Sequence, residues 1–547
     1  MSTSPLHAAG PNLTGAMSRS DPSNIVLTGF MGTGKTTVGR LLAEQLGYEF
    51  VDTDALIEER HGTIPEIFRS RGEEAFRQIE RQLSSELAGR QRLVIATGGR
   101  LMLDPDNVAS LTRNGRVFCL VATPDEIFDR ITADEAGVER PLLSVPEPRQ
   151  RIVELLAERS PEYRRFAQLT TDTVSAEAVA ADLAVLARAE PRRFAIDNPA
   201  GGYEFSVGAA VLPFVRRLAR IDGPMVVVTN AEAGQLYLAS LGDVDLSVTL
   251  PNGSGRPKDL AAVQHVYDAL LDAHVDRSAT IVSLGDSTVG DVAGFTAATY
   301  LRGLDLVHCP TDLVAMIDTS IGGKIGLDVP QGKNLIGLYK QPRAVVADVA
   351  TLQTLSRRQF ASGMAEVVKH ALIAGSDLLT QLEGGEWHRL SHEQRDALGR
   401  LQLLVAQAIQ VKIAIVQDDP FEEARRAVLN LGHTFAYAFE HVGGDALDHG
   451  EAVGVGLVAA ARLSDRVGLT TAPLGDRVES LVAGAGVPTS LPVAIPVEDL
   501  IEAMHRDKKR QGGKLRFVLL RGIGEPVVTE DVPTTALTDV LDGLQPA

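Results

Sequence analysis

The strongest constraint on the fold is the segment at residues 29–36, which reads GFMGTGKT and matches the pattern GxxxxGK[ST]. An apolar stretch, 25–29, runs directly into it, and the helical pattern TTVGRLLAEQL follows. Glycines here let backbone N–H groups curl around phosphates at a helix N-terminus. The lysine neutralises the β- and γ-phosphates, and the hydroxyl after it ligates Mg²⁺. The sequence therefore predicts a strand–loop–helix unit that binds ATP with Mg²⁺ through Gly32, Thr33, Gly34, Lys35, Thr36 and Thr37.

Strand patterns and helical patterns alternate along the first third of the chain, which is typical of a parallel sheet covered by helices. The strand patterns lie at 25–29, 49–54, 93–99 and 116–122. A helical segment at 175–190 precedes a polar break at 191–193, where we place the first domain boundary. A second α/β region has strand patterns at 224–230, 279–285 and 304–310. After about residue 352 helical patterns take over, such as 364–375 and 401–416. The predicted division is a disordered N-terminus at 1–22, α/β domains at 23–190 and 194–352, and a mostly helical domain at 353–547.

Composition narrows the class of protein. The 547 residues carry 53 basic and 71 acidic side chains, a net charge of −18, so the surface repels nucleic acid and anionic membranes. No apolar run approaches the ~18 residues that a membrane-spanning helix needs. The first residues lack the apolar core of a signal peptide, which favours a cytoplasmic protein. Cys119 and Cys309 each lie in an apolar strand pattern, so we expect buried thiols rather than a disulfide or a pair of metal-binding cysteines.

Several polar residues follow the phosphate-binding loop. Asp52 and Asp54 flank Thr53 at the end of the second strand pattern, so two carboxylates of the same side-chain parity project near the phosphates. One suits Mg²⁺, and the other suits binding or deprotonating an acceptor hydroxyl; a solvated acidic pair is the alternative. The arginines Arg77, Arg140 and Arg159 suit a carboxylate or a transferring phosphoryl group, although singly each is more often a surface residue.

At this order and spacing the motifs of residues 22–187 resemble shikimate kinase. The resemblance implies that Lys35 and Thr36 hold the nucleotide and Mg²⁺, with Asp52 near the metal. It further implies that Asp54 is catalytic and orients the shikimate hydroxyls. Arg77 and Arg159 would bind the shikimate carboxylate, and Gly98 and Gly99 would line the pocket. Arg140 would be a catalytic arginine in a lid over the phosphates. One departure stands out: Arg100 replaces the third glycine of the family, and its Cβ and cation are expected either to crowd the shikimate pocket or to change its affinity.

The last third of the chain carries candidate metal ligands. Glu366, His433 and His449 are one carboxylate and two imidazoles, the ligand set of a catalytic zinc site with open positions. His441 has no motif around it and is taken as structural or exposed. Cations cluster in the same region, and a substrate with a phosphate and a carboxylate needs such a cluster, whereas each lysine alone is more often solvated. They are Lys324, Lys333, Lys369, Lys412, Arg426 and Lys508.

The phrases at 290–303 and 316–339, with GMAEVVKHA and LNLGHT, resemble 3-dehydroquinate synthase over about residues 195–540. That family binds NAD⁺ in a Rossmann-like half and zinc (or cobalt) in a helical half, and it converts 3-deoxy-D-arabino-heptulosonate 7-phosphate into 3-dehydroquinate. The resemblance implies zinc at Glu366, His433 and His449 and suggests a homodimer through this part. It implies catalytic roles for Lys369, Lys412, Arg426 and Asn430. The implied NAD-binding residues are Lys258, Gly285, Asp291, Asp318 and Lys333. The implied phosphosugar-binding residues are Arg302, Lys324, Asn334, Lys369, Lys412, Arg426 and Lys508, and Asp318 also matches a substrate position.

Departures from that family concentrate around the expected NAD⁺ site. Asp286 and Ser287 replace two glycines, and a carboxylate there repels a pyrophosphate. The segment 251–258 lacks the glutamate expected to hold a ribose, and Asp328 ends the phrase that is KTGIN in the family. Tyr437 stands in place of a histidine one turn after the first zinc histidine and does not relay protons near pH 7 as imidazole does.

The interpretation favoured by the motifs is a fusion of two shikimate-pathway enzymes. Three alternatives stay open: a kinase-like domain joined to a divergent sugar-phosphate cyclase of secondary metabolism, a metal- and NAD-dependent alcohol dehydrogenase, and a nucleotide-responsive scaffold with decayed sites. The cation cluster argues against the dehydrogenase because net hydride transfer needs no phosphate site. Retention of Lys35 and all three zinc ligands argues against decay.

Overall fold

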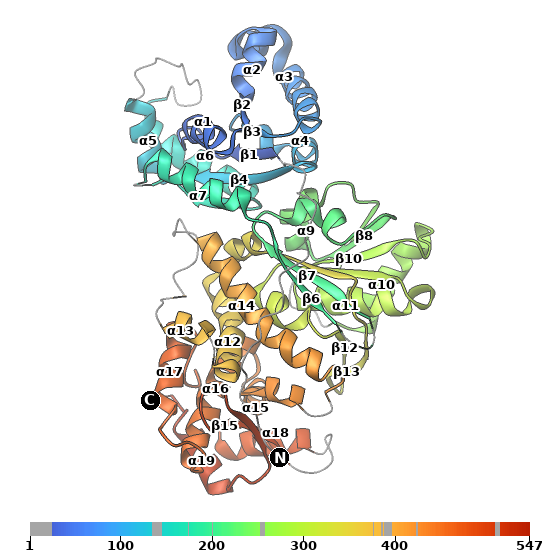
Figure 1. Ribbon diagram of the computed structural model, residues 1–547, viewed down its shortest axis with the longest axis vertical. Helices are drawn as coiled ribbons and strands as arrows, with labels where there is room; N and C mark the ends of the chain where they lie inside the picture. The colour runs from blue at the N-terminus through green and yellow to red at the C-terminus, as the bar shows by residue number, and fades with distance from the viewer. Residues whose placement is uncertain are drawn as a thin grey trace.

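The computed structural model describes residues 24–133, 145–172, 174–197, 199, 201–251, 258–375, 377–383, 387, 397–422, 425–508 and 515–546. The expected disordered N-terminus and Arg140 lie outside these residues, as does the side chain of Lys508. An α/β unit built on the first sheet stands at one end of the long axis, a second α/β unit follows, and a mostly helical region forms the other end (Figure 1). The predicted α/β fold class, with a helical C-terminal part, is confirmed.

The first sheet is fully parallel, with the order β2-β3-β1-β4-β5. Its strands are β1 (Asn24–Thr28), β2 (Glu49–Asp52), β3 (Leu93–Ala96), β4 (Gly115–Val121) and β5 (Ala167–Thr170). Its helices are α1 (Lys35–Leu46), α2 (Thr53–His61), α3 (Ile64–Ala88), α4 (Pro105–Thr112), α5 (Pro124–Ala133), α6 (Pro148–Tyr163) and α7 (Ala176–Arg188). The prediction of a strand through residue 54 is wrong, because the Asp52 side chain accepts the N–H groups of Asp54 and Ala55 and starts α2 there. Asp54 therefore lies in the first turn of a helix.

The second sheet has the order β6-β7-β14-β11-β10-β8-β9 and is parallel except for the antiparallel edge strand β6. Its strands are β6 (Arg192–Ile196), β7 (Tyr203–Gly208), β8 (Met225–Thr229), β9 (Leu246–Thr249), β10 (Thr280–Gly285), β11 (Asp305–Pro310) and β14 (Ala344–Asp348). Two residues of the polar break, Arg192 and Arg193, thus belong to this edge strand. A hairpin of β12 (Lys324–Val329) and β13 (Gly332–Tyr339) projects from this unit, whose helices are α8 (Val215–Leu218), α9 (Ala231–Tyr237), α10 (Leu260–Asp272) and α11 (Ser287–Thr299). Cys119 and Cys309 are buried in β4 and β11, as expected.

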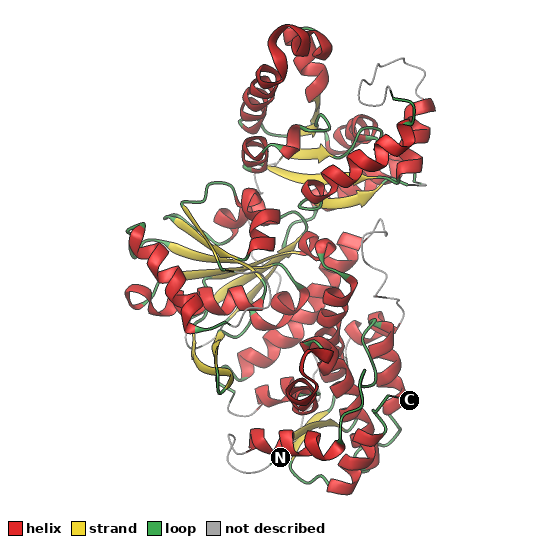
Figure 2. Cartoon of the chain, turned by 180° about the vertical axis from the view of Figure 1, so that it is seen from behind, coloured by secondary structure: helices red, strands yellow, loops and turns green. Residues whose placement is uncertain are grey.

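The C-terminal region is mostly helical (Figure 2). Its helices are α12 (Arg357–Ala374), α13 (Asp377–Glu383), α14 (Ala397–Asp418), α15 (His433–Gly443), α16 (His449–Arg466), α17 (Gly475–Gly484), α18 (Val497–Lys508) and α19 (Thr534–Asp542). The strands β15 (Phe517–Leu520) and β16 (Pro526–Thr529) form a small antiparallel pair that the sequence patterns missed. By length and composition Leu398–Asp418 is the one described helix that qualifies as a membrane span, but 61% of its most apolar window is buried, as in a core helix.

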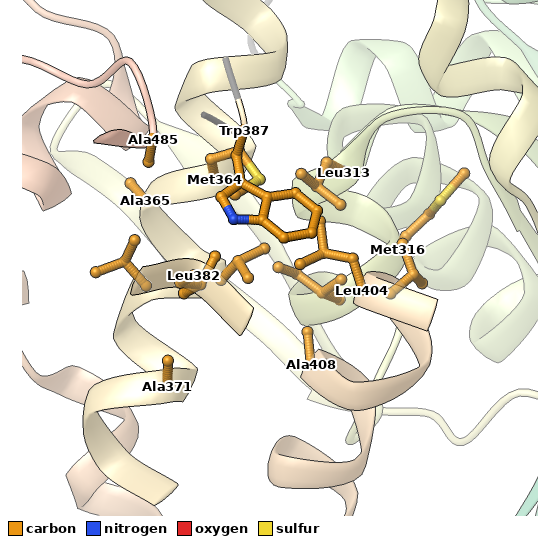
Figure 3. Close-up of a cluster of buried hydrophobic side chains, with 14 of the residues drawn as sticks. Leu313, Met316, Met364, Ala365, Ala371, Leu382, Trp387, Leu404, Ala408 and Ala485 are labelled. Atoms are coloured by element: carbon orange, nitrogen blue, oxygen red, sulfur yellow. The ribbon is translucent and has the colours of Figure 1, made fainter. Parts of the chain in front are cut away.

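A buried apolar cluster holds the helical region against the second sheet. Figure 3 shows Met364 of α12 and Leu404 of α14 packing around Trp387 and toward Leu313, which follows β11. A Cβ at Gly363 of α12 would lie 2.5 Å from the Leu313 Cβ, so only glycine allows this approach. The packing fixes α12, the helix that carries Glu366.

The first α/β unit is joined to the second by buried polar contacts rather than by a linker alone. Arg116 of β4, only 6% exposed, donates to the carbonyls of Leu186 (2.6 Å), Ala187 and Ala189 (3.3 Å each) and, across the boundary, of Ala209 (2.5 Å). Gln353 exchanges two hydrogen bonds with the backbone of Gln168 in β5, at 2.9 and 3.0 Å. The two units therefore share one interface with directional contacts.

Candidate active sites

The phosphate-binding loop lies between β1 and α1. Gly32 and Gly34 have φ angles of 79° and 89°, left-handed conformations that glycine adopts without strain. Lys35 Nζ donates to the carbonyls of Gly29 (3.0 Å) and Phe30 (2.8 Å), so the ammonium lies inside the curve of the loop. The Thr36 hydroxyl donates to Asp52 Oδ2 at 2.8 Å, which places the two proposed Mg²⁺ ligands side by side.

Asp54, in the first turn of α2, is a half-buried carboxyl whose pKa responds to Asp52 and Lys35. Burial raises its pKa to about 6, the negative charge of Asp52 adds to the rise, and Lys35 and Arg77 oppose it. A Cβ on Gly98 would lie 2.3 Å from Asp54 Oδ1, so the glycine leaves the space that this carboxyl occupies. The arrangement suits a group that accepts a proton from an acceptor hydroxyl near neutral pH.

The acceptor side of the same pocket gathers arginines. Arg159 is 5% exposed, lies over the Phe30 ring at 5.4 Å, and faces Gly99. Arg77 donates to the buried Glu80 (2.7 Å) and to the more exposed Glu73 (3.0 Å). Arg100 lies in ordinary backbone conformation, with φ −120° and ψ −8°, so the turn accepts its Cβ without backbone strain. Its guanidinium instead pairs with Glu73 at 3.5 Å.

The metal-ligand set lies together in the helical region. Glu366 comes from the middle of α12, while His433 and His449 are the first residues of α15 and α16. Both imidazole Nε2 atoms point at Glu366 Oε1, at 3.5 and 3.7 Å, and one ligand atom of each residue lies within 4.8 Å of the others. Spacing along the chain did not show this, because 67 residues separate Glu366 from His433.

The outer contacts of both histidines leave Nε2 available to a metal. His433 Nδ1 lies 3.2 Å from the Leu431 carbonyl, and His449 Nδ1 lies 3.0 Å from Glu440 Oε1. Such contacts fix the ring orientation of metal-ligating histidines. Burial lowers the pKa of His449, but the nearby carboxylates of Glu366 and Glu440 outweigh it and raise that pKa to about 10. Glu440 was not predicted from the sequence, although it lies seven residues after His433 in α15 and therefore on the same helix face.

The Glu366 carboxylate is the best test of whether a metal fits. Both of its oxygens are buried and, among the described residues, lack a well-aligned hydrogen-bond donor, although Lys369 Nζ lies 2.5 Å from Oε2. Burial favours the neutral acid, yet Lys369 and His433 hold the pKa of Glu366 well below its usual range. A buried, ionised, under-coordinated carboxylate between two imidazoles fits Zn²⁺ or a similar divalent ion.

Buried cations adjoin the metal-ligand set. Lys412 Nζ lies 2.5 Å from Asp318 Oδ1, and Lys369 Nζ lies 3.9 Å from the same atom. Burial lowers the pKa of Lys412 to about 8, with Asp318 opposing the drop. Arg426 is 3% exposed and fits only because Gly322 lacks a Cβ, which would lie 2.4 Å from its Nη2. Asp318, expected at the NAD⁺ site, thus lies in the cation cluster.

Two of the expected NAD⁺ residues, Gly285 and Asp291, line a pocket at the carboxyl end of β10. Its lining is Ser283, Gly285, Asp286, Ser287, Gly290, Asp291, His308, Pro310, Ala315, Thr319, Ser320 and Ile325. A Cβ on Gly285, whose φ is 157°, would lie 2.7 Å from Val289. Asp286 caps α11 by accepting the Val289 N–H at 3.0 Å, and Lys258 pairs with Asp291. The departure Asp286 therefore has a local role as a helix cap.

The remaining expected residues are more dispersed. Lys324 of β12 forms an ion pair with Glu422. Asn430 donates a hydrogen bond to the same Glu422 carboxylate at 3.4 Å. Lys333 is 73% exposed and lies 3.7 Å from Glu440. In the same hairpin, Asp328 accepts the N–H of Asn334 at 2.7 Å and shapes its turn.

Arg302 stands apart from the metal-ligand set, whereas Tyr437 contacts it. Arg302 is exposed after α11, and within the described residues no hydrogen bond or ion pair links it to the metal ligands. Tyr437 is 46% exposed and packs edge-on against His433, with ring centroids 5.7 Å apart. His441 is exposed, as expected.

Comparison with known proteins places both sites in families. The family model for shikimate kinase matches residues 31–187, and models for the N-terminal and C-terminal parts of 3-dehydroquinate synthase match residues 247–362 and 363–510. The 3-dehydroquinate synthase of Acidithiobacillus ferrooxidans is 41% identical over 362 residues, which make up 64% of this chain and 97% of that protein. The chain belongs to the 3-dehydroquinate synthase family. It carries a shikimate kinase domain ahead of the synthase, so the resemblance seen in the motifs is confirmed.

The chain is also similar to a second synthase and to two proteins of known structure. The 3-dehydroquinate synthase of Halorhodospira halophila is 44% identical over 58% of this chain and 89% of its own. Among solved structures, a 2-epi-5-epi-valiolone synthase from Streptomyces hygroscopicus with NAD⁺ and Zn²⁺ bound has a TM-score of 0.58 and 27% identity, covering 64% of this chain and 99% of that one. A shikimate kinase from Acinetobacter baumannii in complex with shikimate is 40% identical over 30% of this chain and 92% of its own, with a TM-score of 0.28. The protein is a shikimate-pathway enzyme that fuses a kinase and a 3-dehydroquinate synthase.

Proposed function

We propose that the kinase part, at about residues 23–190, transfers the γ-phosphoryl group of ATP to the 3-hydroxyl of shikimate. Lys35 and the loop N–H groups hold the phosphates, and Thr36 and Asp52 hold Mg²⁺. Asp54 accepts the proton of the attacking hydroxyl. Arg77 and Arg159, from α3 and α6, bind the shikimate carboxylate next to Gly98 and Gly99.

We propose that the synthase part, at about 194–352 and 353–547, converts 3-deoxy-D-arabino-heptulosonate 7-phosphate into 3-dehydroquinate and phosphate. Glu366, His433 and His449 hold Zn²⁺ or Co²⁺, which supplies a Lewis acid for the substrate hydroxyls. Lys412 and Arg426 bind the substrate carboxylate, and Lys369 lies next to Glu366 where it steadies developing negative charge. The convergence of these three ligands with two buried lysines is the observation that carries this assignment.

The pocket beyond β10 is the proposed NAD⁺ site, and NAD⁺ there supplies a transient hydride acceptor. It lies at the N-terminus of α11 and the carboxyl end of a parallel strand, where dinucleotides bind in open α/β sheets. Asp286 already fills the helix N-terminus with a carboxylate, so we expect weaker NAD⁺ binding than with glycine at this position. The 41% identity to 3-dehydroquinate synthases favours this substrate over that of a secondary-metabolic cyclase. The proposal places the enzyme in the cytoplasm; its dimeric state stays a prediction.

One experiment with two variants tests both parts in the full chain. Wild-type protein should form ADP from ATP with shikimate and release phosphate from the heptulosonate phosphate in the presence of NAD⁺, the latter abolished by chelator. Lys35→Ala should abolish only ADP formation and Glu366→Gln only phosphate release, so each variant is the folded control for the other. No phosphate release from metal-loaded wild type at saturating NAD⁺ would refute the synthase assignment, and no ADP would refute the kinase assignment.

A further inference from the structure

The inference concerns Arg100, which stands where the kinase family has glycine, and it rests on the proposed shikimate kinase function. Arg77 is expected to hold the acceptor carboxylate, yet both of its terminal nitrogens already bind carboxylates. Nη1 donates to Glu80 Oε2 at 2.7 Å, and Nη2 donates to Glu73 Oε1 at 3.0 Å. A bidentate carboxylate needs two neighbouring N–H groups of the guanidinium, so an acceptor that binds the Nη1–Nη2 edge competes with these two partners for Arg77.

Burial decides which partner leaves. The Glu80 side chain is 2% exposed, and moving an ionised carboxylate that is this buried away from its cation is costly. The Glu73 side chain is 56% exposed and follows Gly72, whose φ of 81° breaks α3 into two segments. Glu73 is therefore the carboxylate that can exchange. Left next to the pocket without a new partner, it would repel the incoming carboxylate.

Besides Arg77, Arg100 is the cation that forms an ion pair with Glu73 and can receive it. Its Nη1 lies 3.5 Å from Glu73 Oε1, the same oxygen that Arg77 binds, so a small movement transfers the carboxylate from one arginine to the other. The Arg77 hydrogen bond lowers the pKa of Glu73, and Arg100 also contributes, so this group is ionised at neutral pH. The backbone of Arg100 is unstrained, and its side chain is 50% exposed and free to follow Glu73.

We propose that Arg100 is a positioning residue that takes Glu73 from Arg77 when the acceptor binds. It replaces the missing third glycine with a cation that frees one edge of Arg77 for the acceptor carboxylate. The effect acts on acceptor binding and leaves phosphoryl transfer itself unchanged. A glycine at this position would leave Glu73 competing with the substrate for Arg77.

The test is a double-mutant cycle in the full chain, with the KM for shikimate and kcat measured at saturating ATP. Arg100→Gly should raise the KM about two- to fivefold at unchanged kcat, the range expected for a partly exposed ion pair. Arg100→Lys should restore part of the loss. Glu73→Gln should lower the KM, and adding Arg100→Gly to Glu73→Gln should have no further effect. Arg151→Gln, which breaks an exposed pair with Glu154 at 3.0 Å on α6, is the matched control and should change neither constant.

Three outcomes would overturn the inference. A lower KM in Arg100→Gly would mean that Arg100 obstructs the pocket. An equal rise in the Glu73→Gln background would mean that Arg100 binds the acceptor directly. A fall in kcat alone would place Arg100 in the transfer step. Absence of ADP formation in the wild type is a separate result, which refutes the proposed kinase function.

Discussion

Replacing Arg116 with methionine tests whether the two α/β units depend on their shared interface. The guanidinium is 6% exposed and donates to four carbonyls, three at the end of α7 and one, Ala209, beyond β7. Burial lowers its pKa to about 10, so it is still protonated at neutral pH. Methionine keeps most of the side-chain volume but removes every donor, which leaves these carbonyls unpaired.

The size of the effect follows from the two short hydrogen bonds. The bonds to Leu186 and Ala209 are 2.6 and 2.5 Å long, whereas the other two are 3.3 Å and weak. An unpaired buried carbonyl costs about 1–3 kcal/mol, and release of a desolvated guanidinium returns part of that cost. We therefore expect Arg116→Met to lower the free energy of unfolding by about 2–4 kcal/mol.

The assay is urea unfolding of the full chain, with kinase and synthase activities followed in the same samples. Because Arg116 contacts both units, both activities should be lost at lower urea than in the wild type. Arg113→Met is the control: Arg113 crosses the same boundary to Asp243 at 3.5 Å, but the two side chains are 62% and 79% exposed. Arg113→Met should lower the free energy of unfolding by less than about 1 kcal/mol. An Arg116→Met effect as small as that of Arg113→Met would refute the reasoning.

Three further predictions address the individual sites. Gly98→Ala places a Cβ 2.3 Å from Asp54 Oδ1. It should lower the kinase kcat/KM about tenfold or more and leave synthase activity unchanged. Normal kinase kinetics in this variant would contradict the placement of Asp54. Glu440→Gln should weaken metal binding about 10- to 100-fold in a chelator competition, because Glu440 orients His449; unchanged affinity would remove that role. Burial lowers the pKa of His308 from 6.5 to about 4. Between these two pH values the unfolded chain binds a proton at this residue and the folded chain does not. The free energy of unfolding should therefore fall by about 3 kcal/mol as the pH is lowered from 6.5 to 4. His308→Gln should remove that part of the pH dependence, and an unchanged slope in unfolding experiments would count against a buried neutral imidazole.

The kinase site was the more predictable of the two because its motif is contiguous. Residues 29–36 contain the strand end, the two left-handed glycines and the first turn of α1, so local conformation alone forms the loop. The error at Asp54 also has a local cause. Asp52 caps α2, and its hydrogen bonds to Asp54 and Ala55 end the strand two residues early.

The synthase site shows what a one-dimensional pattern leaves open. Glu366, His433 and His449 were named from phrases, but only packing of α12, α15 and α16 brings their ligand atoms within 4.8 Å. Asp318 was assigned both to the NAD⁺ site and to a substrate position, and only the fold places it beside Lys369 and Lys412. Short strands such as β9 and β15 escaped notice because their partners, not their own four residues, determine that they are strands.

The sequence by itself determined the order of the parts, their families and the residue types that each chemistry needs. It did so because motifs encode the local backbone geometry and show which ligand-binding side chains are present. Only the tertiary structure decided which charges meet: Arg100 with Glu73, Glu440 with His449, and Arg116 with the carbonyls of both units. These contacts join residues far apart in the chain, and their strength depends on burial and distance, which are properties of the packed fold.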